Sequence, residues 1–148
     1  MSLKEKIEAE MILAAKAKDK ARLSAIRMMK NAVHNKEIDL KKPMEDPDVL
    51  QVLATLSKQR NDSIEQFKAG GRQDLVDKEE AELRVIKEFM PEEMSAGALD
   101  QLIETTIGEV GAVSAKDMGK VMKALMPKIA GKADGKVVSD KVKARLAS

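Results

Sequence analysis

The chain has 148 residues, of which 35% are charged and only 1% are aromatic, and its formal net charge at pH 7 is +2. It contains no cysteine, which excludes disulfide bonds, thiolate catalysis and zinc sites built on cysteine. Ten methionines must help to fill the interior, and this composition favours packed helices over a sheet. The first residues lack an apolar segment of signal-peptide length, so we expect a cytoplasmic protein without a membrane partner.

Residues 1–40 carry the signals of two helices. Ser2, with Glu5 three positions later, forms a candidate capping box for a first helix that reaches about Lys16. Asp19 is a candidate cap for the second helix. Apolar residues recur along that second segment at helical spacing, and they are Leu23, Ile26, Met29 and Val33.

Two more helices are expected before residue 92. Asp46 reads as an N-cap that is followed by Pro47 in the first turn, and the tandem Gly70-Gly71 should end this third helix. A fourth apolar stripe begins near Leu75 and ends before a proline at 91. We therefore predict an N-terminal helical domain of about four helices over residues 1–92.

The remaining residues, 95–148, are predicted to form a three-helix bundle after a boundary at PEEMSAGA (91–98). Gly111 should end the first of these helices, and Ser114 with Asp117 reads as a capping box for the second. Asp134 is the candidate cap of the last helix. Strand signals are absent from the sequence, so the predicted fold class is all-α.

Positive charge is concentrated at the end of the chain. Residues 1–110 carry 18 Lys+Arg against 22 Asp+Glu, a net of −4, whereas residues 111–148 carry 9 against 3, a net of +6. The stretch MGKVMKALMPKIAGKADGK (118–136) holds five lysines and three glycines. It does not match a nucleotide-binding P-loop, because three residues instead of four separate Gly131 from Gly135 and Val137 stands where Ser or Thr is needed.

Helical geometry explains half of this stretch. At 100° per residue, one side of the helix carries Met118, Val121, Met122, Leu125 and Ile129, and the opposite side carries Lys116, Lys120 and Lys123. Glycines and a proline modify this pattern in three ways. One glycine is open to close approach by another backbone, the proline should kink the helix, and two glycines belong to a mobile basic connector. These close-approach or hinge positions are Gly119, Pro127, Gly131 and Gly135.

Candidates for catalysis are few. His34 is the single histidine and has no nucleophile motif near it, and helix capping explains the acids near residue 46. The acids Glu79, Glu80 and Glu82 are interpreted as part of a solvated helix face. The sequence thus predicts no catalytic residue, no metal site and no cofactor.

The acid-poor basic segments favour an anionic partner, and nucleic-acid phosphate is the commonest one. No aromatic residue lies beyond Phe89, so base stacking is excluded as the main mode and a structured RNA such as tRNA is favoured over an unpaired strand. Lysine side chains are predicted to contact the phosphates, and they are Lys116, Lys120, Lys123, Lys128, Lys132 and Lys136.

Several segments together resemble the YqeY family, whose domain is similar to the C-terminal tail of the GatB protein of the tRNA-dependent amidotransferase. They are LSAIRMMKNAV (23–33), LSKQRNDSIEQF (56–67), GRQDLVDKEEAEL (71–83), FMPEEMS (89–95) and DMGKVMKALMPKIAGKADGKVV (117–138). The resemblance implies an all-α protein with a three-helix C-terminal part that helps to engage tRNA. It also implies a protein partner in tRNA aminoacylation or amidation, while the catalytic parts of the amidotransferase are absent.

Residues 96–98, Ala-Gly-Ala, depart from the family pattern, which often places acids there, and they weaken the expected helix start. Within the family-like motif at 56–67, Gln59, Arg60 and Ser63 fall near one helix face, and packing explains them as well as a ligand site does.

Three hypotheses follow. The first is a non-catalytic, tRNA-binding or amidotransferase-related accessory protein. The second is a protein-interaction adaptor that docks a partner through methionine-rich helices. The third, and weakest, is a carbon–nitrogen ligase with glutamine as amido donor, as the family resemblance implies.

Overall fold

A computed structural model describes residues 1–147, and in that range it contains seven α-helices, one 3₁₀ turn and no strand. The predicted all-α class is confirmed. Contacts divide the chain into two compact units, Met1–Pro91 and Glu92–Ser148. Whether these units are independent domains with the predicted limits, 1–92 and 95–148, stays a prediction. Within residues 1–147, every helix is too short or too polar to cross a membrane.

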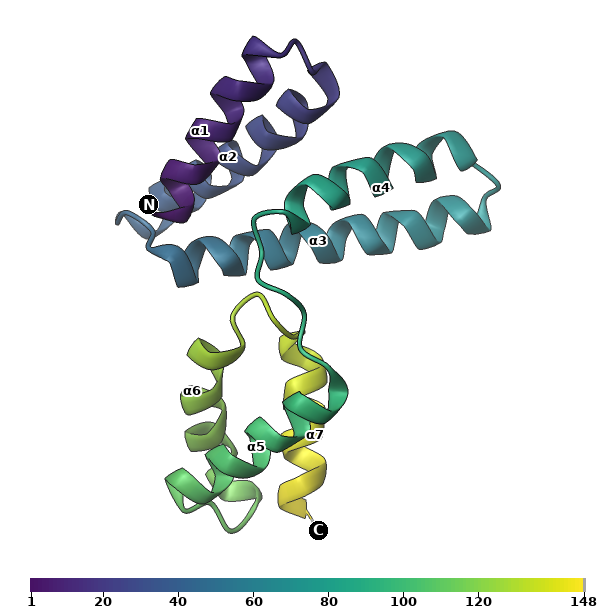
Figure 1. The fold of residues 1–148 in the computed structure, drawn as a ribbon. Helices are drawn as coiled ribbons and strands as arrows, with labels where there is room; N and C mark the ends of the chain where they lie inside the picture. The colour runs from purple at the N-terminus through teal and green to yellow at the C-terminus, as the bar shows by residue number, and fades with distance from the viewer. Residues whose placement is uncertain (148) are drawn as a thin grey trace. The chain divides into compact units, whose positions relative to one another are not determined.

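The first unit is built from two helical hairpins (Figure 1). One hairpin pairs α1 (Leu3–Lys16) with α2 (Lys20–Leu40), and the other pairs α3 (Asp46–Ala69) with α4 (Gln73–Lys87). Helix α2 contacts all three other helices, because its apolar stripe faces the middle of the unit. The side chains at the centre of this core are completely buried, and they are Ile26, Met29, Val49, Leu53 and Ile86.

Local signals at the helix ends act largely as predicted. The Ser2 hydroxyl accepts a hydrogen bond from the Glu5 backbone N–H at 3.2 Å, and the Asp19 carboxylate accepts one from Arg22 N–H at 3.1 Å. The predicted N-cap of the third helix, Asp46, is wrong. The N-cap is Glu45, and Asp46 is already the first helical residue. Glu45 takes this place because its backbone N–H donates to the carboxylate of the residue three positions on, at 3.1 Å.

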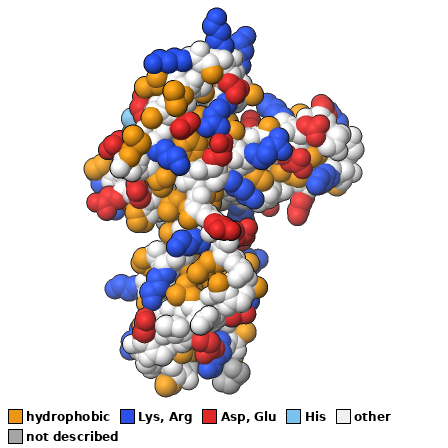
Figure 2. All heavy atoms as spheres, in the orientation of Figure 1, with side chains coloured by type: hydrophobic (Ala, Val, Ile, Leu, Met, Phe, Trp, Pro, Cys, Tyr) orange, Lys and Arg blue, Asp and Glu red, His pale blue; other side chains and the backbone are white. Residues whose placement is uncertain are grey.

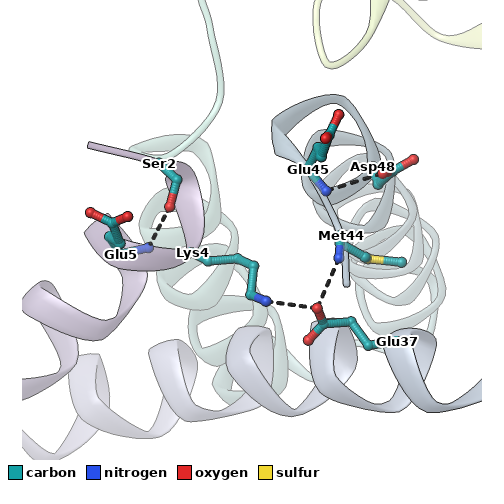
Figure 3. A network of polar contacts seen from close by, with 7 residues as sticks. All are labelled: Ser2, Lys4, Glu5, Glu37, Met44, Glu45 and Asp48. Atoms are coloured by element: carbon teal, nitrogen blue, oxygen red, sulfur yellow. Dashed lines mark hydrogen bonds and ion pairs between the residues drawn. The ribbon is translucent and has the colours of Figure 1, made fainter. Parts of the chain in front are cut away.

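A polar network fixes the junction of α1, α2 and α3 (Figure 3). The Glu37 carboxylate accepts from Lys4 Nζ at 2.6 Å and from the Met44 backbone N–H at 2.8 Å. These two hydrogen bonds, with the Lys4 bond the stronger influence, lower the pKa of Glu37 below its ordinary value. The ionised Glu37 therefore ties the end of α2 both to α1 and to the segment that leads into α3.

Arg60 joins α3 to α4. Its Nε lies 2.9 Å from Glu82 and 3.4 Å from Glu79, and its side chain is only 15% exposed. The guanidinium also contacts the sulfur of Met28 in α2. The interpretation of Glu79 and Glu82 as a solvated face is therefore wrong, because both carboxylates turn inward to Arg60. Of the family-like trio, Arg60 has a packing role, whereas Gln59 is exposed and Ser63 is half-buried.

The second unit packs α5 (Ala96–Val110), α6 (Met118–Ile129) and α7 (Gly135–Ala147) around one core, and the 3₁₀ turn η1 (Ala115–Asp117) leads into α6. The core comes from all three helices. Its most deeply buried side chains are Thr106, Val121, Leu125, Ile129, Val138 and Val142. The Thr106 hydroxyl is satisfied within its own helix, since it donates to the Leu102 carbonyl at 2.8 Å.

Two predicted helix caps in this unit have different outcomes. Ser95 accepts a hydrogen bond from Ala98 N–H at 3.1 Å, so the cap forms although no acid follows it. The expected capping box of Ser114 and Asp117 is wrong, because the Ser114 side chain caps nothing. Asp117 instead accepts from Val113 N–H at 3.0 Å and closes the loop before η1.

Candidate nucleic-acid interface

Helix α6 has the two sides that its sequence predicts. Val121, Leu125 and Ile129 are buried in the core of the unit, and the methionines at 118 and 122 are half-buried beside them. Lys120 and Lys123 are exposed on the opposite side, and Lys116 is exposed in η1 just before the helix. Burial of the apolar side therefore directs a row of ammonium groups into solvent.

Helix α5 supplies the carboxylates that neutralise part of the basic charge. Glu109 pairs with Lys128 at 3.0 Å, and Asp100 pairs with Lys141 at 2.8 Å. Glu104 pairs with Arg145 and raises the pKa of its guanidinium. One basic residue of α6 and two of α7 are thus held against α5.

Five of the six predicted lysines form no ion pair with any residue in the described range 1–147. We call them the unpaired lysines, and they are Lys116, Lys120, Lys123, Lys132 and Lys136. All five are exposed. In Figure 2, basic side chains project from the side of this unit that carries α6. Lys128 was predicted with them, but the structure brings it to Glu109 instead.

Two carboxylates lie near this set, Asp117 and Asp134, and the Asp134 carboxylate accepts a hydrogen bond from Lys136 N–H at 2.9 Å. The backbone N–H of Val113 lowers the pKa of Asp117, and the charge of Lys120 lowers it further. Asp117 is therefore an ionised residue that is engaged by the backbone, and it partly offsets the field of Lys120.

The turn between α6 and α7 presents Lys132 on a fixed backbone. Gly131 has φ +72°, a conformation that favours glycine, and Lys132 N–H donates to the Ile129 carbonyl at 2.8 Å. The Lys132 carbonyl accepts from Met94 N–H at 2.9 Å. The predicted connector is shorter than expected, because Gly135 and Lys136 already belong to α7.

The other predicted hinge and close-approach positions differ in their surroundings. Pro127 lies inside α6, which continues to Ile129, so the helix does not end there. Apart from its two chain neighbours and the nearby backbone of α6, a Cβ added to Gly119 would have no atom of residues 1–147 within 4 Å, so packing among these residues does not require a glycine at that position. Gly119 adjoins Lys120 on the exposed side, where it leaves room for another molecule.

His34 and the acidic side chains are the remaining candidates for a functional site. His34 is exposed on α2. Residues 1–147 hold no group of three or more His, Cys, Asp or Glu side chains arranged for a metal ion. The exposed lysines described above are suited to binding an anion through their ammonium groups.

Comparison with known proteins identifies the family. The family model described as Yqey-like protein matches residues 4–146. The protein named "Altered inheritance of mitochondria protein 41, mitochondrial" is 41% identical in Saccharomyces cerevisiae over 85 residues, which are 57% of this chain and 46% of the relative. The protein of that name from Lachancea thermotolerans is 39% identical over 75 residues, 50% of this chain and 40% of the relative.

A third relative with this name, from Pyrenophora tritici-repentis, is 30% identical over 142 residues, which are 93% of this chain and 77% of the relative. The chain therefore spans less than half the length of the two yeast relatives but most of the third. The family match nevertheless runs through all seven helices, and it confirms the resemblance inferred from the motifs. The chain belongs to the family of Yqey-like proteins.

Proposed function

We propose that this protein binds structured RNA, with tRNA as the expected ligand, through the unpaired lysines of its C-terminal unit and without a catalytic activity of its own. The observation that carries the proposal is the division of basic residues in this unit. Lys128, Lys141 and Arg145 are each paired with a carboxylate of α5, whereas the five unpaired lysines face solvent. Unpaired ammonium groups of one sign attract a polyanion and release its counterions on binding.

The chemistry of the unit favours phosphate contacts. Beyond Phe89 the sequence has no aromatic side chain on which a base could stack. Lysines on a helix and an adjoining turn can instead follow the backbone of a folded RNA, whose shape and phosphates are accessible without unstacking. The motif resemblance to the GatB tail supports tRNA as that RNA. It also supports a partner protein in tRNA aminoacylation or amidation as part of the proposal.

The test is the salt dependence of tRNA binding by the full chain. The variant Lys120→Ala/Lys123→Ala/Lys132→Ala should bind more weakly, and its log–log salt slope should be smaller by roughly two to three units. The control Lys128→Ala/Lys141→Ala/Arg145→Ala removes the same charge from paired positions and should lose less affinity. Equal affinity of the parent and the first variant would overturn the proposal.

The adaptor hypothesis now has less support from the methionines. Eight of the ten are buried or half-buried, and only Met1 and Met126 are exposed. Most of these flexible side chains therefore fill the two cores, where they serve packing. Protein partners that co-purify after RNase treatment, in the absence of RNA, would favour an adaptor.

A further inference from the structure

We propose that the outer face of α2, in the N-terminal unit, is a second binding surface for the sugar–phosphate backbone of RNA. A shallow trough runs along this helix. Its polar lining consists of Lys20, Ser24, Arg27, Asn31 and Asn35. This surface belongs to a different unit from the unpaired lysines, and the inference does not depend on them.

The five polar residues form one stripe because they recur at intervals of three or four positions. All five are exposed, whereas Ala25, Ile26, Met29 and Val33 of the same helix are buried on the other side. From Lys20 to Asn35 the stripe is about 22 Å long at 1.5 Å per residue. The core of the unit thus fixes α2 with this stripe directed outward.

The basic residues of α2, like those of the C-terminal unit, fall into two groups: some form ion pairs with carboxylates and others do not. Arg22 pairs with Glu10 at 3.1 Å and also with Glu88, and Lys30 pairs with Glu8 at 2.6 Å. Lys20 and Arg27, which line the trough, form no ion pair within residues 1–147. No acidic residue occurs between positions 20 and 36, and among residues 1–147 no carboxylate lines the trough.

The positive charge continues from the end of the trough into the turn between α1 and α2. Lys16, at the end of α1, and Lys18 are exposed there and form no ion pair in the described chain, and the one acid of the turn, Asp19, caps α2 through Arg22 N–H. Lys18 has φ +58°, a conformation that glycine adopts more easily, and its N–H donates to the Ala15 carbonyl at 3.2 Å. Basic side chains gather over this turn in Figure 2. The turn therefore directs a cation outward from a position that glycine would occupy at lower cost.

The mixture of side chains indicates which polyanion fits. Lysine, arginine, serine and asparagine are the groups that donate most hydrogen bonds to phosphate and sugar oxygens. The amides of Asn31 and Asn35 can both donate to and accept from a ribose hydroxyl, which a simple patch of lysines cannot do. Leu23 and Met28, the larger apolar residues of the lining, are half-buried, and the preference for RNA rests on the cations and amides of the stripe. RNA is accordingly favoured over a membrane surface.

The test uses the full chain and an unmodified tRNA transcript. The variant Lys20→Ala/Arg27→Ala/Asn31→Ala should bind about tenfold more weakly, with a salt slope smaller by about one to two units. The matched control Lys58→Ala/Lys78→Ala/Asn61→Ala removes one exposed amide and two exposed cations that form no ion pair within residues 1–147, elsewhere in the same unit. Thermal unfolding of both variants verifies that the fold is retained.

The outcomes separate this inference from the proposed function. A loss of affinity in the α2 variant but not in the control supports it, whatever the variant of the C-terminal lysines does. If the α2 variant binds tRNA as tightly as the control, the inference is wrong, even where the C-terminal variant loses affinity. Binding to phosphatidylserine vesicles that the α2 substitutions abolish, with tRNA affinity unchanged, would also overturn it in favour of a membrane surface.

Discussion

Lys128 Nζ lies 3.0 Å from the Glu109 carboxylate, and this ion pair separates Lys128 from the five unpaired lysines. The pair forms because residue 128 lies at the edge of the apolar side of α6, next to α5, whereas Lys120 and Lys123 lie opposite the core. Six lysines that look equivalent in the sequence are therefore of two kinds. One is held by a neighbouring helix, and five are available to an external anion.

This difference predicts unequal effects of single substitutions on RNA affinity. Lys120→Ala should weaken tRNA binding several-fold and reduce the salt slope by about one unit, because one phosphate contact is lost. Lys128→Ala should change the slope much less and should lower the free energy of unfolding by no more than about 1 kcal/mol, as for other exposed ion pairs. Fluorescence anisotropy at several salt concentrations measures both slopes. Equal slopes for the two variants would contradict the assignment.

Gly119 offers a test in which stability and binding move in opposite directions. Gly119→Ala places a methyl group where, apart from its chain neighbours and the nearby backbone of α6, no atom of residues 1–147 lies within 4 Å, so it should stabilise α6 by up to about 1 kcal/mol through helix propensity. If an RNA backbone approaches this glycine, the same methyl group should weaken tRNA binding. Thermal denaturation measures the change in stability, and fluorescence anisotropy on the same sample measures the change in tRNA affinity. Unchanged affinity would exclude a close approach of RNA at Gly119.

The acid stability of the N-terminal unit should depend on Glu37. Its hydrogen bonds from Lys4 and Met44 lower its pKa in the folded state below the ordinary value of 4.5. The stabilisation is therefore fully present above about pH 4.5 and is lost as the pH falls through the lower folded-state pKa. Glu37→Gln should be less stable than the parent at pH 7, and the difference should shrink below pH 4.5. The measurement is urea denaturation of the parent and of Glu37→Gln at pH 7 and at pH 3.

Glu92 provides the control for this experiment, since it is exposed and engaged in no hydrogen bond or ion pair within residues 1–147. Glu92→Gln should leave the pH dependence unchanged. A constant difference between the parent and Glu37→Gln from pH 7 to pH 3 would mean that ionisation of Glu37 does not contribute to the junction of α1, α2 and α3.

Local features of the fold could be predicted from the sequence because their causes lie within a few residues. Asp19 caps its helix through an N–H three positions away, and Gly111 ends α5 with φ +68°. The start of α3 was misplaced by one residue because Glu45 and Asp46 are both acids before a proline, and either could cap the helix. Such errors do not alter which face of the helix is buried.

Pairings between distant residues could not be predicted in this way. Arg60 and Glu82 are 22 positions apart, and only the packing of α3 against α4 brings their charges together. The outer face of α2 was missed for a related reason. The net charge of residues 1–110 is −4, and this average conceals a helix whose carboxylate-free side lies opposite its buried side.

Because each unit has its own core, we expect a cavity made in one core to destabilise only the unit that contains it. Leu125 belongs to the core of the C-terminal unit and Leu53 to that of the N-terminal unit, and both are completely buried. Leu125→Ala should cost its unit about 2–5 kcal/mol, a large part of the stability of so small a unit. Hydrogen exchange should then show lost protection in α5, α6 and α7 and unchanged protection in α1 to α4.

Leu53→Ala is the reciprocal variant and should affect only α1 to α4. Fragments 1–91 and 92–148 provide an independent measurement, because each contains a complete core and should give a helical circular-dichroism spectrum with its own cooperative melting transition. Loss of protection throughout the chain in either single variant would instead mean that the two units unfold together.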